Sequence, residues 1–244
     1  YLEHIQKQCN CKIIIRTHNI EHEIWQDLQN NTNNLFKKIF YFFIKKQIKK
    51  WENYICKKAD FICCISKNDI HYFMKKVKKD VKLLPVSFSI NNKNKSANFS
   101  IFHLGSMDWK PNVEGVNWFL NEVWAKFEKE NISISCYLAG KNMPHNIQNR
   151  STQKLIIEGT VKNATNYMCN KSVMIVPIFS GSGIRIKILE GMALGIPIIS
   201  TSKGAKGIPY KNEENILIAD NALSFYKMIK KIYNNPSLFE KISQ

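Results

Sequence analysis

The chain has 244 residues, of which 44% are hydrophobic and 11% aromatic, so it can bury the core of one large or two smaller domains. Its 36 basic and 19 acidic residues give a formal net charge of +17, which favours polyanions or an anionic membrane surface as partners. Seven cysteines without metal-type spacing argue against a zinc site or a disulfide framework and indicate reduced thiols. No run of roughly eighteen apolar residues is present, and we expect a cytoplasmic protein.

The first third of the chain alternates short apolar runs with helical patterns. Strands are predicted at residues 12–16, 60–65 and 81–84, and helices at residues 35–58 and 67–77, the latter capped by Ser66. The stretch of residues 89–98 is polar and has no periodicity, which predicts a linker.

The rest of the chain repeats this alternation. Strands are predicted at residues 99–104, 132–139, 155–157, 173–177, 198–199 and 216–219, and helices at residues 113–130, 163–169, 184–194, 222–233 and 237–242. Alternating strands and helices predict an α/β fold with parallel sheets. We therefore divide the chain into a first domain of residues 1–88, a linker of residues 89–98 and a second domain of residues 99–244.

The stretch from Val173 to Ile208 forms a β-loop-α-β pattern around the small residues Gly181, Ser182 and Gly183. Ligands of parallel sheets lie beyond the carboxyl ends of the strands. In this unit the Gly-Ser-Gly loop occupies that position, and its backbone N–H groups together with the dipole of the following helix favour an anion.

Charged residues follow this loop closely. Arg185 and Lys187 lie at the positive end of the predicted helix, where a cation is unfavourable unless an anion binds. Lys187 and Glu190 fall on one helix face, an arrangement that suits a nucleoside diphosphate, with Lys187 on the diphosphate and Glu190 on the ribose diol. The alternative, a solvated Lys–Glu pair worth a few tenths of a kcal/mol, explains the spacing equally well.

Two further stretches follow predicted strands. Gly105 begins a turn-rich loop in which a glycine admits close backbone approach to a ligand and Lys110 adds charge, although an ordinary βα loop has the same composition. His18 lies just after the strand of residues 12–16, where a histidine is more commonly structural than functional.

The predicted helix of residues 35–58 is amphipathic and rich in lysine. One interpretation is a bridging helix with a solvated basic face, and the other is peripheral attachment to anionic lipid. The high charge also raises nucleic acid as a partner. We expect none, because no helix-turn-helix, zinc finger or aromatic RNA-binding signature is present and the lysines are dispersed.

Three motifs resemble glycosyltransferase family 4. They are V-P-x-x-x-G-S-G-I-R-x-K-x-L-E-x-M-A-x-G-x-P-I-I-S-T-x-x-G-A-x-G-I from Val176, F-H-L-G-S-M-D-W-K-P-N from Phe102, and R-x-H-N-x-E from Arg16. Members of that family are retaining, nucleotide-sugar-dependent enzymes of the GT-B fold. The resemblance extends from about Ile13 to the end of the chain, and it implies two Rossmann-like domains with a cleft between them.

The resemblance implies transfer of a sugar from a nucleoside-diphosphate sugar to a glycan or lipid-linked acceptor hydroxyl, with retention, in surface polysaccharide or glycolipid synthesis. Lys187, Arg185 and the loop amides would stabilise the leaving diphosphate, and Glu190 would anchor the ribose. His18, with Glu21 as a weaker candidate, would lie near the donor sugar. The chain contains no D-x-D motif, so we expect a metal-independent enzyme without a cofactor.

Some positions depart from the family pattern. Many members have an arginine just after the glycine that corresponds to Gly105, where this chain has Ser106 and Met107, which leaves Lys110 as a substitute. Many members also begin the donor loop with glutamate where this chain has Ser182. The first domain lacks its opening strands and the end of the chain stops short of the family's crossing helix, so we expect an incomplete copy that binds donor without turnover. The alternative is an inactive protein that binds nucleotide sugar, membrane or nucleic acid.

Overall fold

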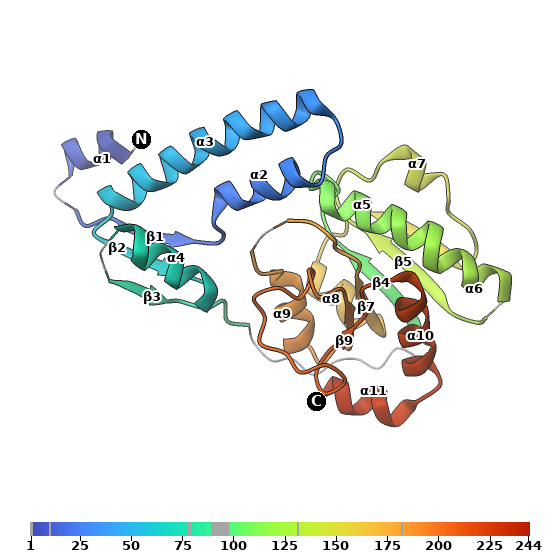
Figure 1. Cartoon of the computed structure of the whole chain (residues 1–244). Helices are drawn as coiled ribbons and strands as arrows, with labels where there is room; N and C mark the ends of the chain where they lie inside the picture. Colours follow the sequence, from blue (N-terminus) through green and yellow to red (C-terminus); the bar gives the residue numbers. More distant parts are fainter. Residues whose placement is uncertain (1, 10, 78–79, 89–97, 131, 182) are drawn as a thin grey trace. The chain divides into compact units, whose positions relative to one another are not determined.

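The structure is a computed structural model that describes every residue except 1, 10, 78–79, 89–97, 131 and 182 (Figure 1). The chain divides into two compact units, the first formed by residues 1–86 with 181–184 and the second by residues 87–180 with 185–244. Both units are α/β with parallel strands, as the sequence predicts. The linker predicted at residues 89–98 lies outside the described residues apart from Asn98, so the predicted domain boundaries stay a prediction.

The first unit is built on a three-stranded parallel sheet in the order β1-β2-β3. Its elements are α1 (Leu2–Gln8), β1 (Ile14–Thr17), α2 (Glu21–Asn30), α3 (Leu35–Lys58), β2 (Phe61–Cys64), α4 (Lys67–Val77) and β3 (Val81–Leu83). The predicted strands and α3 are confirmed, and the Ser66 hydroxyl accepts a hydrogen bond from the N–H of Asn68, as expected of an N-cap. Helices α1 and α2 were not predicted from the sequence.

Helix α3 begins with a side-chain cap, since the Asn34 side chain accepts a hydrogen bond from the N–H of Lys37. It packs against α2 (Figure 1). Only Cys56 of α3 is buried, whereas Phe36, Phe40 and Phe43 are exposed in the described structure. Among the described residues, no helix combines the length and the apolar character needed to cross a membrane.

The second unit has a six-stranded parallel sheet in the order β6-β5-β4-β7-β8-β9. The strands are β4 (Ser100–Leu104), β5 (Ser135–Ala139), β6 (Leu155–Gly159), β7 (Val173–Val176), β8 (Ile198–Ser200) and β9 (Leu217–Ile218). The helices are α5 (Lys110–Trp118), the π-helical η1 (Phe119–Trp124), α6 (Ala125–Glu130), α7 (His145–Gln148), α8 (Ala164–Cys169), α9 (Ile186–Ala193), α10 (Ala222–Tyr233) and α11 (Pro236–Ser243). The predicted alternation is confirmed, and α7 is an additional helix.

The helix predicted at residues 113–130 begins three residues earlier, at Lys110, so the prediction of a loop through Asn112 is wrong. Pro111 lies in the first turn, where its missing N–H costs no hydrogen bond. The middle of the helix is π-helical, and this segment buries Phe119, Leu120 and Trp124 in the main core. A π turn differs from an α turn by its i→i+5 hydrogen bonds, and the apolar spacing of so short a segment did not reveal them.

Candidate functional site

The strand order of the second unit locates a binding edge. From β4 the chain adds β5 and then β6 on one side, and it then returns to place β7, β8 and β9 on the other side of β4. The chain therefore reverses direction between the neighbouring strands β4 and β7. In open parallel sheets, ligands bind beyond the carboxyl ends of the strands at such a switch point. The loops that leave this point lead into α5 and α9.

Glycines let the backbone pack closely at this edge. A Cβ atom on Gly115 of α5 would lie 1.9 Å from the carbonyl oxygen of Pro177, just after β7. A Cβ atom on Gly105, one residue beyond β4, would lie 2.6 Å from Asn112 Nδ2 and 3.0 Å from His103 Nε2. The first two turns of α5 are therefore held directly against the ends of β4 and β7.

Helices α5 and α9 begin at this edge without capping side chains. The N-cap residues are Trp109 for α5 and Arg185 for α9, and neither side chain accepts a hydrogen bond from its helix. Four other helices begin with an asparagine whose side chain caps the first turn, namely α3, α8, α10 and α11. Helix N-termini without a side-chain cap offer N–H groups and a positive dipole end to an anion.

Arg185 and Trp109 connect the two helix starts. The Arg185 guanidinium carbon lies 4.5 Å from the centroid of the Trp109 ring, a cation–π contact. The structure thus brings a predicted site residue, Arg185, onto an aromatic side chain that sequence reasoning missed. The sequence does show Trp109 shortly before the predicted helix, in W-K-P-N, but nothing in the spacing links this residue to Arg185.

Lys110 lies at the start of α5, where the sequence analysis expected an extra positive charge. Its Nζ atom lies 3.2 Å from Glu114 Oε1 one turn later, and the pair is about half exposed. The Ser180 hydroxyl, in the loop after β7, donates to the other Glu114 oxygen at 3.4 Å. Lys110 is therefore near the switch point, with its charge shared with Glu114.

A polar network holds the loop between β4 and α5. Asp108 accepts hydrogen bonds from the Asn142 side chain at 2.7 Å and from the Ser106 hydroxyl at 2.9 Å. These two bonds hold the pKa of the Asp108 carboxyl below its usual range. Asn112 donates from its side chain to the carbonyl oxygen of Ser106 at 2.7 Å. Ser106 thus helps fix the loop at the position where many members of the resembled family have an arginine.

His103 lies in the middle of β4 and is buried, with 3% of its surface exposed. Its Nδ1 atom lies 3.1 Å from the carbonyl oxygen of Ile175, so Nδ1 carries the proton and donates. Burial lowers the pKa of His103 to about 4, because desolvation disfavours the charged ring. In the part of the chain that the structure describes, no group pairs with the buried Nε2 atom. His103 was not singled out from the sequence.

Lys187 and Glu190 lie one turn apart on α9, as predicted. Lys187 Nζ is 2.7 Å from Glu190 Oε2, and the side chains are 41% and 14% exposed. The Thr165 hydroxyl of α8 donates to Glu190 Oε1 at 3.0 Å. By comparison, the side chains of Lys211 and Glu214, which also pair three residues apart, are 76% and 56% exposed. Glu190, in contrast, is largely enclosed and has a fixed second partner, which sequence reasoning missed.

The loop before α9 was predicted to bind an anion. Gly181 has φ +95° and Gly183 has φ +78°, conformations that glycine adopts without strain. Ser182 lies outside the described residues, so its predicted role is not addressed by the structure. Residues 181–184 group with the first unit.

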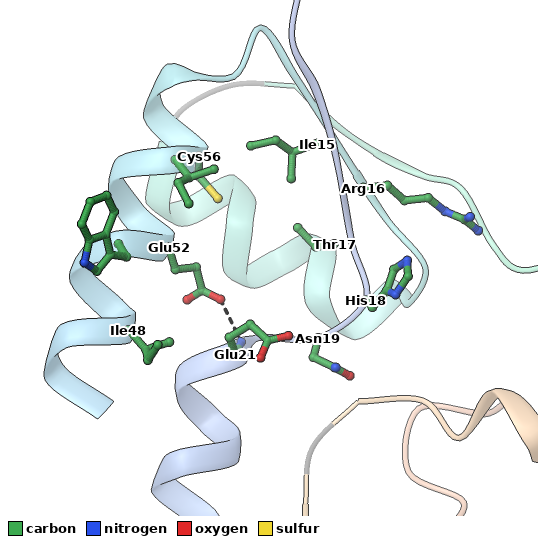
Figure 2. A pocket seen from close by; sticks show the side chains of 11 residues that line it. Ile15, Arg16, Thr17, His18, Asn19, Glu21, Ile48, Glu52 and Cys56 are labelled. Atoms are coloured by element: carbon green, nitrogen blue, oxygen red, sulfur yellow. Dashed lines mark hydrogen bonds between the residues drawn. The ribbon is translucent and has the colours of Figure 1, made fainter. Parts of the chain in front are cut away.

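His18 and Glu21 belong to the first unit, where both line a pocket of about 410 Å³. Figure 2 shows this pocket between strand β1, with Ile15 and Thr17, and helix α3, with Ile48 and Glu52. The structure therefore places His18 and Glu21 beside one another in a pocket of their own unit.

A buried carboxylate forms one wall of this pocket. Glu52 accepts a hydrogen bond from the N–H of Glu21 at 2.9 Å (Figure 2). Its other carboxylate oxygen lies 2.8 Å from His22 Nδ1. The Tyr72 hydroxyl donates to the same oxygen at 3.4 Å. Burial and the neighbouring Glu52 charge raise the pKa of Tyr72 above its ordinary value. Sequence reasoning missed Glu52 because it is a single acid among the lysines of α3.

A family model described as glycosyl transferases group 1 matches residues 98–235, which is more than half of the chain. The chain belongs to this family. A curated relative, an uncharacterized 44.6 kDa protein in the cps region of Klebsiella pneumoniae, is 28% identical over 247 residues. The match covers 94% of this chain and 62% of that relative, so the chain spans less than two thirds of the relative's length.

Solved structures support the same fold. WaaG, a glycosyltransferase involved in lipopolysaccharide biosynthesis, matches with a TM-score of 0.73 at 10% identity over 99% of this chain and 74% of WaaG. The pneumococcal O-GlcNAc transferase GtfA, solved in complex with UDP and GlcNAc, matches with a TM-score of 0.67 at 13% identity over 99% of this chain and 49% of GtfA. At these identities the likeness concerns the fold, and it confirms the predicted Rossmann-like, GT-B class for this group 1 glycosyltransferase chain.

Proposed function

We propose that this protein transfers a sugar from a nucleoside-diphosphate sugar to an acceptor hydroxyl, with retention, as a member of glycosyltransferase family 4. The observation that carries the proposal is the meeting of α5 and α9 at the β4/β7 switch point, with Arg185 stacked on Trp109. Two uncapped helix starts and nearby cations form the surroundings that a diphosphate requires.

The residue roles follow from this arrangement. Lys187 and Arg185, with the helix dipoles, stabilise the negative charge that develops on the leaving diphosphate. Lys110 and the backbone at Gly105 contribute from the segment that follows β4, and the backbone at Gly181 contributes from the segment that follows β7. Glu190 accepts hydrogen bonds from the ribose hydroxyls. These groups supply the charge compensation by themselves, so the proposal includes no metal ion and no cofactor.

His18 and Glu21 act on the sugar side of the reaction in this proposal. They line the pocket of the first unit together with Thr17 and Trp51, which offer polar groups and an aromatic face to a carbohydrate. The acceptor is a glycan or a lipid-linked sugar. The location of the Klebsiella relative in the cps region and the UDP and GlcNAc bound by GtfA support a hexosyl nucleotide donor and polysaccharide or glycolipid synthesis.

Donor binding is tested by replacing Lys187. Hydrogen bonds to charged groups contribute about 1.5–3 kcal/mol, so Lys187→Ala should lower the affinity for UDP or GDP about tenfold to a hundredfold in titration calorimetry. Lys211→Ala is the matched control, because Lys211 also pairs with a glutamate three residues later but is well exposed. Equal nucleotide affinity of the wild type and both variants would overturn the proposed donor site.

Turnover is a separate question from donor binding. We propose that this chain binds donor more readily than it transfers sugar. Incubation with UDP- and GDP-sugars and a polysaccharide or lipid-linked acceptor checks this, and measurable transfer would contradict it. The second candidate function, a binding protein without activity, predicts nucleotide binding with no transfer under any of these conditions.

Helix α3 supports a peripheral contact with an anionic membrane at the cytoplasmic face. It carries eight lysines and one acidic residue, and Phe36, Phe40 and Phe43 are exposed among these lysines. Each lysine near an anionic surface contributes about 1 kcal/mol, and added salt screens that attraction. Co-sedimentation should therefore show binding to phosphatidylserine vesicles that falls with salt. Equal binding to neutral vesicles would contradict the electrostatic contact.

A further inference from the structure

Glu190 has a different partner on each of its carboxylate oxygens. Oε1 accepts a hydrogen bond from the Thr165 hydroxyl at 3.0 Å, and Oε2 lies 2.7 Å from Lys187 Nζ. The three residues come from two helices, because Thr165 belongs to α8 while the other two belong to α9. The side chain of Glu190 is 14% exposed and that of Lys187 is 41% exposed, so Lys187 is the freer partner.

In this arrangement Glu190 and a bound anion compete for the ammonium group of Lys187. An anion that takes the lysine must draw its ammonium group from Glu190, and Oε2, in a largely enclosed position, then loses the cation that it contacts in the described structure. Leaving such a carboxylate without a hydrogen bond is costly. A nucleoside diphosphate removes the cost, because its ribose hydroxyls donate to Glu190 while its phosphates accept from Lys187. Inorganic pyrophosphate can accept from Lys187, but it has no ribose hydroxyls to donate to Glu190.

We infer that Thr165 is a positioning residue that holds Glu190 in place while Lys187 passes from Glu190 to the diphosphate, and that it thereby favours nucleotides over inorganic pyrophosphate. This inference rests on the proposed function, since it assigns the same donor site a further residue. Thr165 does not touch the ligand in this account. Thr165 keeps the Glu190 carboxylate oriented toward the ribose diol after the Lys187–Glu190 ion pair has opened.

Helix α8 is a firm support for this role. The Asn163 side chain caps it by accepting from the N–H of Asn166 at 2.9 Å. Met168 is fully buried, and the Tyr167 ring makes an edge contact with Phe102 of β4 at 5.8 Å between centroids. The Thr165 hydroxyl is therefore fixed with respect to the sheet, whereas Lys187 reaches Glu190 through a long and half-exposed side chain.

Three variants of the full chain test the inference. Thr165→Val removes the hydroxyl at nearly constant volume, Thr165→Ser restores it, and Asn166→Ala changes an exposed neighbour on the same helix. Titration calorimetry with UDP, GDP, 2′-deoxy-UDP and pyrophosphate should show a threefold to tenfold loss of nucleotide affinity in Thr165→Val, recovered in Thr165→Ser. Pyrophosphate affinity should change by less than about twofold, and the preference for UDP over 2′-deoxy-UDP should shrink.

A fourth variant tests the exchange without altering α8. Glu190→Ala releases Lys187 from its ion pair, so pyrophosphate should bind about threefold more tightly while UDP and GDP bind more weakly. Unchanged nucleotide affinity in Thr165→Val, or equal losses of nucleotide and pyrophosphate affinity, would overturn the inference while leaving the donor site intact. So would weaker pyrophosphate binding in Glu190→Ala. A wild-type chain that binds no nucleotide would instead overturn the proposed function itself.

Discussion

The guanidinium group of Arg185 lies over the indole ring of Trp109, 4.5 Å from its centroid. Arg185 is the N-cap of α9 and Trp109 is the N-cap of α5. These helices follow β7 and β4, which are neighbouring strands of the sheet. A cation at a helix N-terminus is unfavourable by itself, and the aromatic face offsets part of that cost. The contact therefore holds a positive group where two helix dipoles already favour an anion.

Trp109 should accordingly contribute to nucleotide binding through Arg185. Trp109→Ala removes a cation–π contact worth about 0.5–2 kcal/mol, so the affinity for UDP or GDP should fall about twofold to thirtyfold. Trp109→Phe keeps an aromatic face and should lose less than about threefold. Titration calorimetry measures both values. Wild-type affinity in Trp109→Ala would mean that Arg185 needs no support from the ring.

His103 should make the stability of the chain depend on pH. Its pKa is about 4 in the folded protein and 6.5 ordinarily, so below pH 6.5 the unfolded chain takes up a proton that the folded chain does not. Stability should therefore fall as the pH falls from 6.5 towards 4, with a loss of about 1.5 kcal/mol by pH 5. Urea unfolding followed by circular dichroism at pH 7, 6 and 5 measures the slope.

A pair of histidine variants assigns that slope to one residue. His103→Gln keeps a donor for the carbonyl oxygen of Ile175 but cannot titrate, so the loss between pH 6.5 and 5 should be smaller than in the wild type. His145→Gln, which changes an exposed histidine of α7, provides the slope for comparison. The same slope in His103→Gln would show that other groups cause the pH dependence.

Local patterns in the sequence were sufficient for much of the fold and part of the site. Residues 35–58 were predicted as one helix with the bounds that the structure gives, because apolar residues recur there at three- and four-residue steps. The Lys187–Glu190 pair was predicted because three residues on a helix span one turn. Such features depend on neighbours in the sequence.

The missed features depend on contacts between distant residues. Trp109 and Arg185 are 76 positions apart, and Thr165 and Glu190 are 25 positions apart, so no local pattern joins them. Glu52 and His103 were also missed, because the contact that fixes each side chain comes from another element. Glu52 contacts His22, and His103 contacts the carbonyl oxygen of Ile175. The early start of α5 was missed because the proline after Lys110 was taken as part of a loop.

Glu52 should stabilise the first unit. The carboxylate is 9% exposed and accepts hydrogen bonds from His22 and from the N–H of Glu21, so Glu52→Ala leaves the largely buried His22 side chain without this partner, whereas water can reach the N–H of Glu21. We expect the free energy of unfolding to fall by about 3 kcal/mol. Glu23→Ala, on helix α2, is the control and should cost less than about 0.5 kcal/mol. Urea unfolding followed by circular dichroism compares the two, and equal costs would contradict a structural role for the buried pair.

Gly115 and Gly159 provide a final test, because each excludes a side chain for a different reason. Gly115 has no unusual φ, but a Cβ atom there would lie 1.9 Å from the carbonyl oxygen of Pro177, so Gly115→Ala must push α5 away from the end of β7. We expect a loss of at least about 2 kcal/mol in stability and a loss of nucleotide affinity, since both helix starts depend on that packing. Gly159 has φ +65°, and a Cβ atom there would meet no other atom within 4 Å. Gly159→Ala should therefore cost about 1 kcal/mol in stability from backbone strain alone. Thermal unfolding and UDP titration of both variants distinguish the two causes. Equal stability losses, or unchanged nucleotide affinity in a folded Gly115→Ala, would show that the start of α5 does not need its close approach to β7.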